Sequence, residues 1–172
     1  MSAARAASAV LLGILVVAST RADAQEAARG LRGLTRVVLE ISLSPDLVDS
    51  RDDVEQRLEQ ALREQAPAPA PVRDGTDKLR LVVRVQAKDA SELRGFWLPL
   101  SGTYAIGYVR LSVERAVTLP GPTASGLTVP AVVWEADQLI AAPWREVDGK
   151  VHDAVDKLAG LFLEDYRRTR GR

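Results

Sequence analysis

Lys78 to Ala87 reads KLRLVVRVQA, and this stretch decides the fold. Apolar side chains occupy alternate positions, at Leu79, Leu81, Val83 and Val85. Polar side chains lie between them, at Lys78, Arg80, Arg84 and Gln86. Because side chains of a strand alternate between its two faces, the pattern predicts a half-buried strand with a dry face and a polar outer face.

The flanking sequence supplies the elements that complete this sheet and cover its dry face. Alternating or helical periodicity predicts further strands over 35–43, 104–119 and 128–140, and helices over 51–65 and 144–168. Two helices on a mixed sheet give the order β-α-β-β-β-α. We therefore predict an α+β fold, a two-layer sandwich of a four-stranded mixed sheet with both helices on one face.

The domain limits follow from the segments between and outside these elements. Residues 35–168 form a single α+β domain, residues 25–34 a flexible lead-in, and residues 169–172 a basic tail. The run APAPAP at 66–71 predicts a stiff connector, because proline lacks an N–H and favours extended backbone before it. Arg115 interrupts the apolar face of the strand over 104–119, so either a bulge shifts the pattern or Arg115 lies beyond the core.

The first 24 residues have the pattern of a cleaved signal peptide. Arg5 precedes an apolar run at 9–18, and Ala22-Asp23-Ala24 forms an A-x-A cleavage site. The run is too short to span a bilayer. We expect an exported protein without a transmembrane span after cleavage, located in the periplasm if the source cell is Gram-negative.

Composition excludes several functional classes. The chain has 23 basic and 23 acidic residues, and this balance argues against a nucleic-acid-binding protein. It has no cysteine, which excludes disulfides, thiolate metal sites and a lipidated N-terminal cysteine. No glycine-rich phosphate loop and no G-x-S-x-G turn occurs. We expect no cofactor, no metal site and no catalytic residue.

His152 is the only histidine, and it raises the one enzymatic alternative. Asp148 and Asp156 lie four residues before and after it on the predicted helix. Residues eight apart on a helix are about 12 Å apart, so both aspartates cannot chelate one ion with good geometry. A solvated helix face is the favoured interpretation; a hydrolase or metal enzyme centred on His152 stays the alternative.

Two groups of residues are candidate contact surfaces. An aromatic and aliphatic group in the link after the opening strand predicts a partner loop or a cover over the core end: Phe96, Trp97, Leu98 and Leu100. Basic side chains of the outer sheet face form the second group: Arg80, Arg84 and Arg110. They are expected among acidic residues of neighbouring strands, as in a cross-strand charge lattice.

The element order behind a signal sequence resembles small periplasmic α/β modules of envelope-assembly systems. Examples are the N-terminal domain of the Tol-system periplasmic protein and the lipopolysaccharide-assembly lipoprotein. The strand Val133, Trp134, Glu135 and a helix ending on Phe162, Asp165 and Tyr166 also look like uncharacterised exported bacterial proteins. The resemblance implies binding or assembly, although this chain has no cysteine to lipidate.

A non-catalytic exported binding or envelope-associated role is therefore the leading hypothesis, with an envelope protein as the possible partner. The alternative is a carrier of a small apolar ligand, using a cleft between the last helix and the sheet near Trp97, Trp134 and Trp144. The sequence does not indicate an oligomeric state.

Overall fold

The computed structural model of the chain describes residues 30–65, 67–92, 102–119 and 127–170. The expected signal peptide lies outside these residues. The elements follow in the order β1 (Arg36–Ser42), η1 (Pro45–Ser50), α2 (Arg51–Glu64), β2 (Ala70–Val72), β3 (Lys78–Asp89), η2 (Ala90–Glu92), β4 (Thr103–Leu119), β5 (Leu127–Pro143), η3 (Trp144–Glu146) and α3 (Val147–Arg170). The fold is α+β, as predicted.

The sheet has the order β2-β1-β3-β4-β5 and mixes parallel with antiparallel pairs. β1 and β3 are parallel, with Leu39 beside Leu79, as expected for two strands joined through a helix. β4 is antiparallel to both β3 and β5, so the last three strands form an antiparallel meander. The opening stretch lies at the centre of the sheet.

The predicted strand count was wrong, because the sheet has five strands rather than four. The additional strand is β2, which lies within the segment expected to be a connector and pairs with β1 in parallel. Ala70 donates its N–H to Thr35 O at 2.9 Å, and alternation then turns the nitrogen of Pro71 away from β1. Proline is tolerated there because an edge strand leaves that side unpaired.

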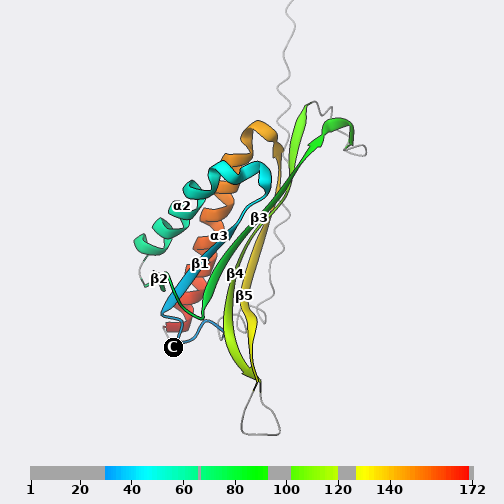
Figure 1. Ribbon diagram of the computed structural model, residues 1–172. Coiled ribbons are helices and arrows are strands. Elements are labelled where there is room, and N and C mark those ends of the chain that lie inside the picture. The colour runs from blue at the N-terminus through cyan, green and yellow to red at the C-terminus, as the bar shows by residue number, and fades with distance from the viewer. Residues whose placement is uncertain (1–29, 66, 93–101, 120–126, 171–172) are drawn as a thin grey trace, which may run out of the picture.

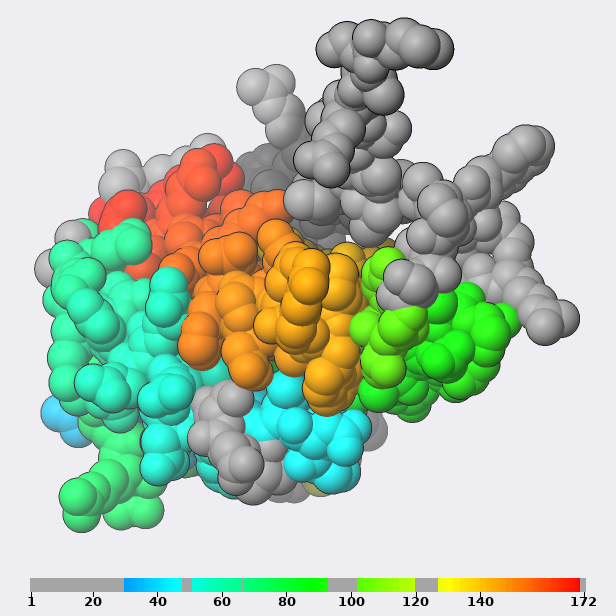
Figure 2. Space-filling view, turned by 90° about the horizontal axis from the view of Figure 1, so that it is seen from above, coloured from blue at the N-terminus to red at the C-terminus, as the bar shows by residue number. Residues whose placement is uncertain are grey.

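Both helices lie on the same side of the sheet, over its dry face (Figure 1). α3 contributes nine buried residues and α2 contributes three. Figure 2 shows the start of α3 in orange between α2 on one side and the ends of β3 and β4 in green on the other. Leu79, Leu81, Val83 and Val85 are buried beneath them, as the alternation predicts.

The segment from Gly30 to Leu34, part of the expected flexible lead-in, is packed on the core. Leu31 and Leu34 are fully buried. Gly30 lies so close to β5 that an added Cβ would be 2.5 Å from Val133 O. The Tyr166 hydroxyl of α3 donates a hydrogen bond to Leu34 O at 2.7 Å, which joins this segment to the last helix.

Arg115 lies beyond the edge of the core and also borders a bulge. The register shifts between Val113 and Glu114, where Val133 is the extra residue of β5. Arg115 donates from Nη1 to Gly30 O at 3.0 Å and to Arg32 O at 2.8 Å. Its guanidinium also pairs with Asp77 at 3.3 Å. The charge that interrupts the apolar face therefore binds the N-terminal segment.

Tyr166→Phe is expected to lower the free energy of unfolding by about 1–3 kcal/mol, because it leaves the buried Leu34 carbonyl without its hydrogen bond. Urea denaturation measures the change. Tyr108→Phe is the control, since no described residue bonds the Tyr108 hydroxyl. Equal effects of the two substitutions would show that the Tyr166 bond does not stabilise the fold.

Candidate functional site

The predicted charge lattice is present on the outer face of β1, β3 and β4. Glu40 of β1 contacts Lys78 and Arg80 of β3, with Arg80 Nη2 at 2.9 Å from Glu40 Oε2. Arg80 also pairs with Glu114 of β4 at 2.7 Å. The parallel and antiparallel registers bring these side chains together on three adjacent strands.

This network fixes the charges of its members. Hydrogen bonds from Lys78 and then Arg80 lower the pKa of Glu40 below its ordinary value. The hydrogen bond to Glu40 raises the pKa of Arg80. Glu40 is therefore an anion whose charge is balanced within the sheet, and Arg80 is a cation with two acidic partners. Both charges are already paired within the sheet, so neither residue is available to bind a charged ligand.

Arg84 and Arg110 differ from each other in whether they have an acidic partner. Arg110 pairs with Glu135 of β5 at 3.5 Å, and its guanidinium carbon lies 5.4 Å from the centroid of the Tyr108 ring. Arg84 has a single weak hydrogen bond, from Nη2 to Ser42 Oγ at 3.4 Å. Among the described residues, no carboxylate pairs with Arg84. Of the three predicted arginines, it is the one available to an anion.

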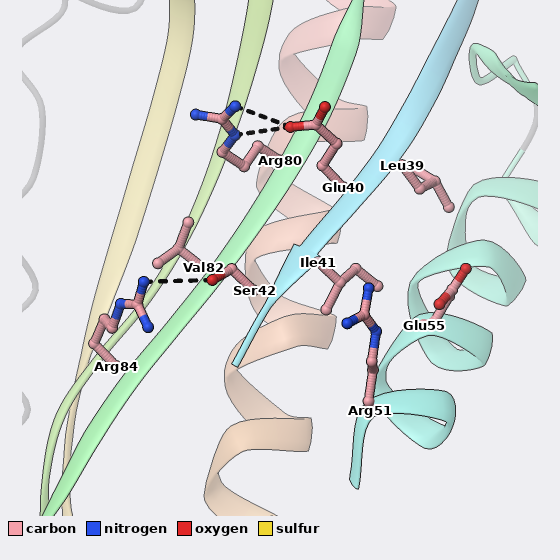
Figure 3. A pocket seen from close by; sticks show the side chains of 9 residues that line it. All are labelled: Leu39, Glu40, Ile41, Ser42, Arg51, Glu55, Arg80, Val82 and Arg84. Atoms are coloured by element: carbon pink, nitrogen blue, oxygen red, sulfur yellow. Dashed lines mark hydrogen bonds and ion pairs between the residues drawn. The ribbon is translucent and has the colours of Figure 1, made fainter. Parts of the chain in front are cut away.

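A trough runs over the C-terminal half of β1 and includes two of the predicted residues, Arg80 and Arg84. It is a cavity of about 510 Å³, lined by Leu39, Glu40, Ile41, Ser42, Arg51, Glu55, Arg80, Val82 and Arg84. Figure 3 shows β1 along its floor, the β3 side chains on one side, and Arg51 and Glu55 of α2 on the other.

The trough exists because β2 is short. β2 pairs with β1 only at Arg36, Val37 and Val38, so the following residues of β1 have no neighbour on that edge. Thr35 O accepts from β2, whereas Val38 N donates to Asp77 O on the β3 side. By alternation, the N–H and C=O groups of Leu39 and Ile41 point to the open edge. No described residue bonds them there.

Sequence reasoning missed the α2 wall of the trough. Arg51 and Glu55 lie one helical turn apart, and neither forms an ion pair with a described residue. The available signal was Pro71, since a strand containing proline is short and at an edge. A short edge strand implies that its longer neighbour is left partly unpaired.

The aromatic group predicted as a contact loop, Phe96, Trp97, Leu98 and Leu100, lies outside the described residues and stays a prediction. Trp134 is in the packed core. Its ring centroid is 5.3 Å from that of Phe162, and its Nε1 donates to Asp165 Oδ2 at 3.0 Å. Trp144 is partly buried against the same core. The described tryptophans therefore fill space between helix and sheet.

His152 lies on α3 between Asp148 and Asp156, about one helical turn from each. Both Asp156 oxygens accept hydrogen bonds from Arg57 of α2, at 2.7 and 2.6 Å. Within the described ranges, no group of three His, Cys, Asp or Glu side chains is placed to hold a metal ion. Asp156 instead joins the two helices.

Comparison with known proteins gives fold-level similarity at low scores. No protein-family model and no curated protein matches the chain. A PelC variant from Paraburkholderia phytofirmans, solved as a dodecamer, is 17% identical over 74% of this chain and 84% of its own, with a TM-score of 0.42. A minor lipoprotein from Acinetobacter baumannii is 13% identical over 80% of this chain and 93% of its own, with a TM-score of 0.36. Rare lipoprotein B from Shewanella oneidensis is 19% identical over 77% of this chain and 96% of its own, with a TM-score of 0.35.

Two of these three proteins are lipoproteins by name. Similarity at this level transfers neither an activity nor an assembly state to the chain. In the part of the chain that the structure describes, no helix is long and apolar enough to cross a membrane.

Glu40→Gln is expected to lower the free energy of unfolding at neutral pH, because Lys78 and Arg80 lose their shared anion. The lowered pKa of Glu40 means that its contribution is present above pH 4.5, the ordinary glutamate value, and is lost as the pH falls through the folded-state pKa. The stability difference between variant and wild type should therefore shrink on acidification. Urea denaturation at neutral pH and at about pH 3 measures it.

Glu55→Gln is the matched control, since Glu55 has no ion pair with a described residue. Its effect on the free energy of unfolding should be small at both pH values. A Glu40→Gln difference that stays constant with pH would contradict the assigned role of this carboxylate.

Proposed function

We propose that the chain is a non-catalytic exported binding protein that holds an extended segment of an envelope partner along β1. The observation that carries the proposal is the open edge at Leu39 and Ile41, which lies within the trough. A peptide strand added to this edge would hydrogen-bond to both residues and continue the row begun by β2.

The dimensions and chemistry of the trough support an extended ligand. A segment of four residues in β conformation is about 13 Å long, which matches the stretch from Leu39 to Ser42. Main-chain hydrogen bonds supply affinity that depends little on sequence, and side-chain pockets supply specificity. Alternate ligand side chains would face either the outer wall at Arg84 or the α2 wall at Glu55.

The charges favour an acidic side chain on the outer wall. Arg84 has no carboxylate partner among the described residues, whereas Glu40 beside it is already balanced by Lys78 and Arg80. A ligand carboxylate at Arg84 would therefore form a charge-assisted hydrogen bond without displacing an existing pair. On the α2 wall, Glu55 accompanies Arg51 and weakens any preference for an anion.

Selection of displayed random peptides on the purified protein tests this function. Retained peptides should be extended, should carry Asp or Glu, and should shift the backbone amide resonances of Leu39 and Ile41. Arg84→Glu should weaken their binding by about tenfold or more, as expected for a lost charge-assisted contact.

Lys150→Glu is the control, because Lys150 is an exposed α3 residue outside the trough with the same change of charge. It should leave peptide affinity unchanged. The proposal fails if no peptide is retained, or if Arg84→Glu and Lys150→Glu bind the selected peptides equally.

A further inference from the structure

β5 forms the other edge of the sheet, and beyond Val133, which Gly30 contacts, no described strand pairs with its outer side. It pairs with β4 from Leu127 to Pro143, and no strand of the described chain lies on its far side. An edge strand presents a row of unpaired N–H and C=O groups, which makes it a template for another strand. Natural edges are usually protected against such pairing.

The backbone features that protect β5 are confined to its first half. Pro130 lacks an N–H, and the bulge at Val133 interrupts the regular ladder. Both features are devices that block edge pairing. From Trp134 to Ala142 the strand has no proline, no lysine and no further register shift. These nine residues, about 30 Å of backbone, form an edge protected only by the charges of Glu135 and Asp137.

Apolar side chains gather beside this part of the edge on the outer face. Leu139 is 64% exposed, the largest exposure of an apolar side chain in the segment. It lies opposite Tyr108, and the next pair on the same face joins Ala141 to Ile106, which is 37% exposed. A strand placed next to β5 would cover Leu139 directly.

We propose that a second copy of the chain pairs with this segment, antiparallel and across a two-fold axis near Leu139. Two identical edges can pair with each other only through such an axis. Leu139 of each copy would then lie opposite its mate, and the two sheets would form one continuous sheet of ten strands. The paired leucines and the neighbouring Ile106 side chains would bury apolar surface that is exposed in the single chain.

Charge decides the register. With the axis at Leu139, Asp137 lies opposite the partner position of Ala141, and Glu135 lies opposite that of Pro143. An axis at Asp137 or Glu135 would place like charges directly opposite each other, which destabilises a strand pair. Glu135 is also balanced by Arg110 within its own copy. The favoured register therefore opposes no two carboxylates.

This inference does not depend on the proposed function. The trough lies at the β1 side of the sheet, and β5 lies at the opposite end of the strand order. Pairing through β5 would leave both troughs open. Loss of peptide binding and loss of self-association can therefore be measured separately.

Cysteine cross-linking tests the axis, since the natural chain has no cysteine. In Leu139→Cys the two thiols would lie directly opposite each other, with Cβ atoms about 4.5–5.5 Å apart, near disulfide distance. Mild oxidation should convert most of this variant into a covalent dimer. Leu127→Cys is the matched control, because Leu127 is 67% exposed on the same strand but lies on the protected half. It should form no covalent dimer.

Sedimentation velocity of the wild type at increasing concentration should show a reversible monomer–dimer equilibrium. Leu139→Lys, which puts two cations at the axis, should shift it to monomer while circular dichroism shows an unchanged fold. The inference is overturned if the wild type stays monomeric, if both cysteine variants cross-link equally, or if Leu139→Lys leaves the dimer intact.

Discussion

The dry face of β3 has to be covered along its length, and much of the structure follows from that constraint. Leu79, Leu81, Val83 and Val85 are buried, and the core that encloses them draws on side chains of both helices. α2 and α3 therefore lie together on the same side (Figure 1). An ion pair links the two helices on their exposed side, with Arg57 Nη2 2.6 Å from Asp156 Oδ2. The hydrogen bond to Asp156 raises the pKa of Arg57 and so favours its charged form.

The sequence predicted the features that depend on local periodicity. The alternation in β3 located the central strand, and the three- and four-residue spacing of Val151, Val155, Leu158 and Phe162 located α3. The charge lattice was also predictable, because side chains of known face and opposite sign meet once neighbouring strands are in register. Glu40 and Arg80 are the clearest case.

Features that depend on where a strand stops could not be predicted in the same way. Pro71 argued against a strand, and only its place at the sheet edge permits one. The trough follows from the end of β2, which is a property of two strands rather than one. Leu31 and Leu34 lie in a short segment beside Gly30 and Gly33, where two apolar residues give too little periodicity to indicate burial. Arg84 looked equivalent to Arg80 and Arg110 until their partners were placed.

α3 provides nine of the buried side chains and is the last element of the described chain. Tyr166, near its end, bonds to Leu34, 132 residues earlier. A chain that emerges with its N-terminus first therefore has all five strands available before it has the helix that covers β4 and β5. Its core can close only when the final segment arrives. Contacts so far apart in sequence make folding slow. The apolar face of β4 and β5 therefore stays exposed until α3 packs on it.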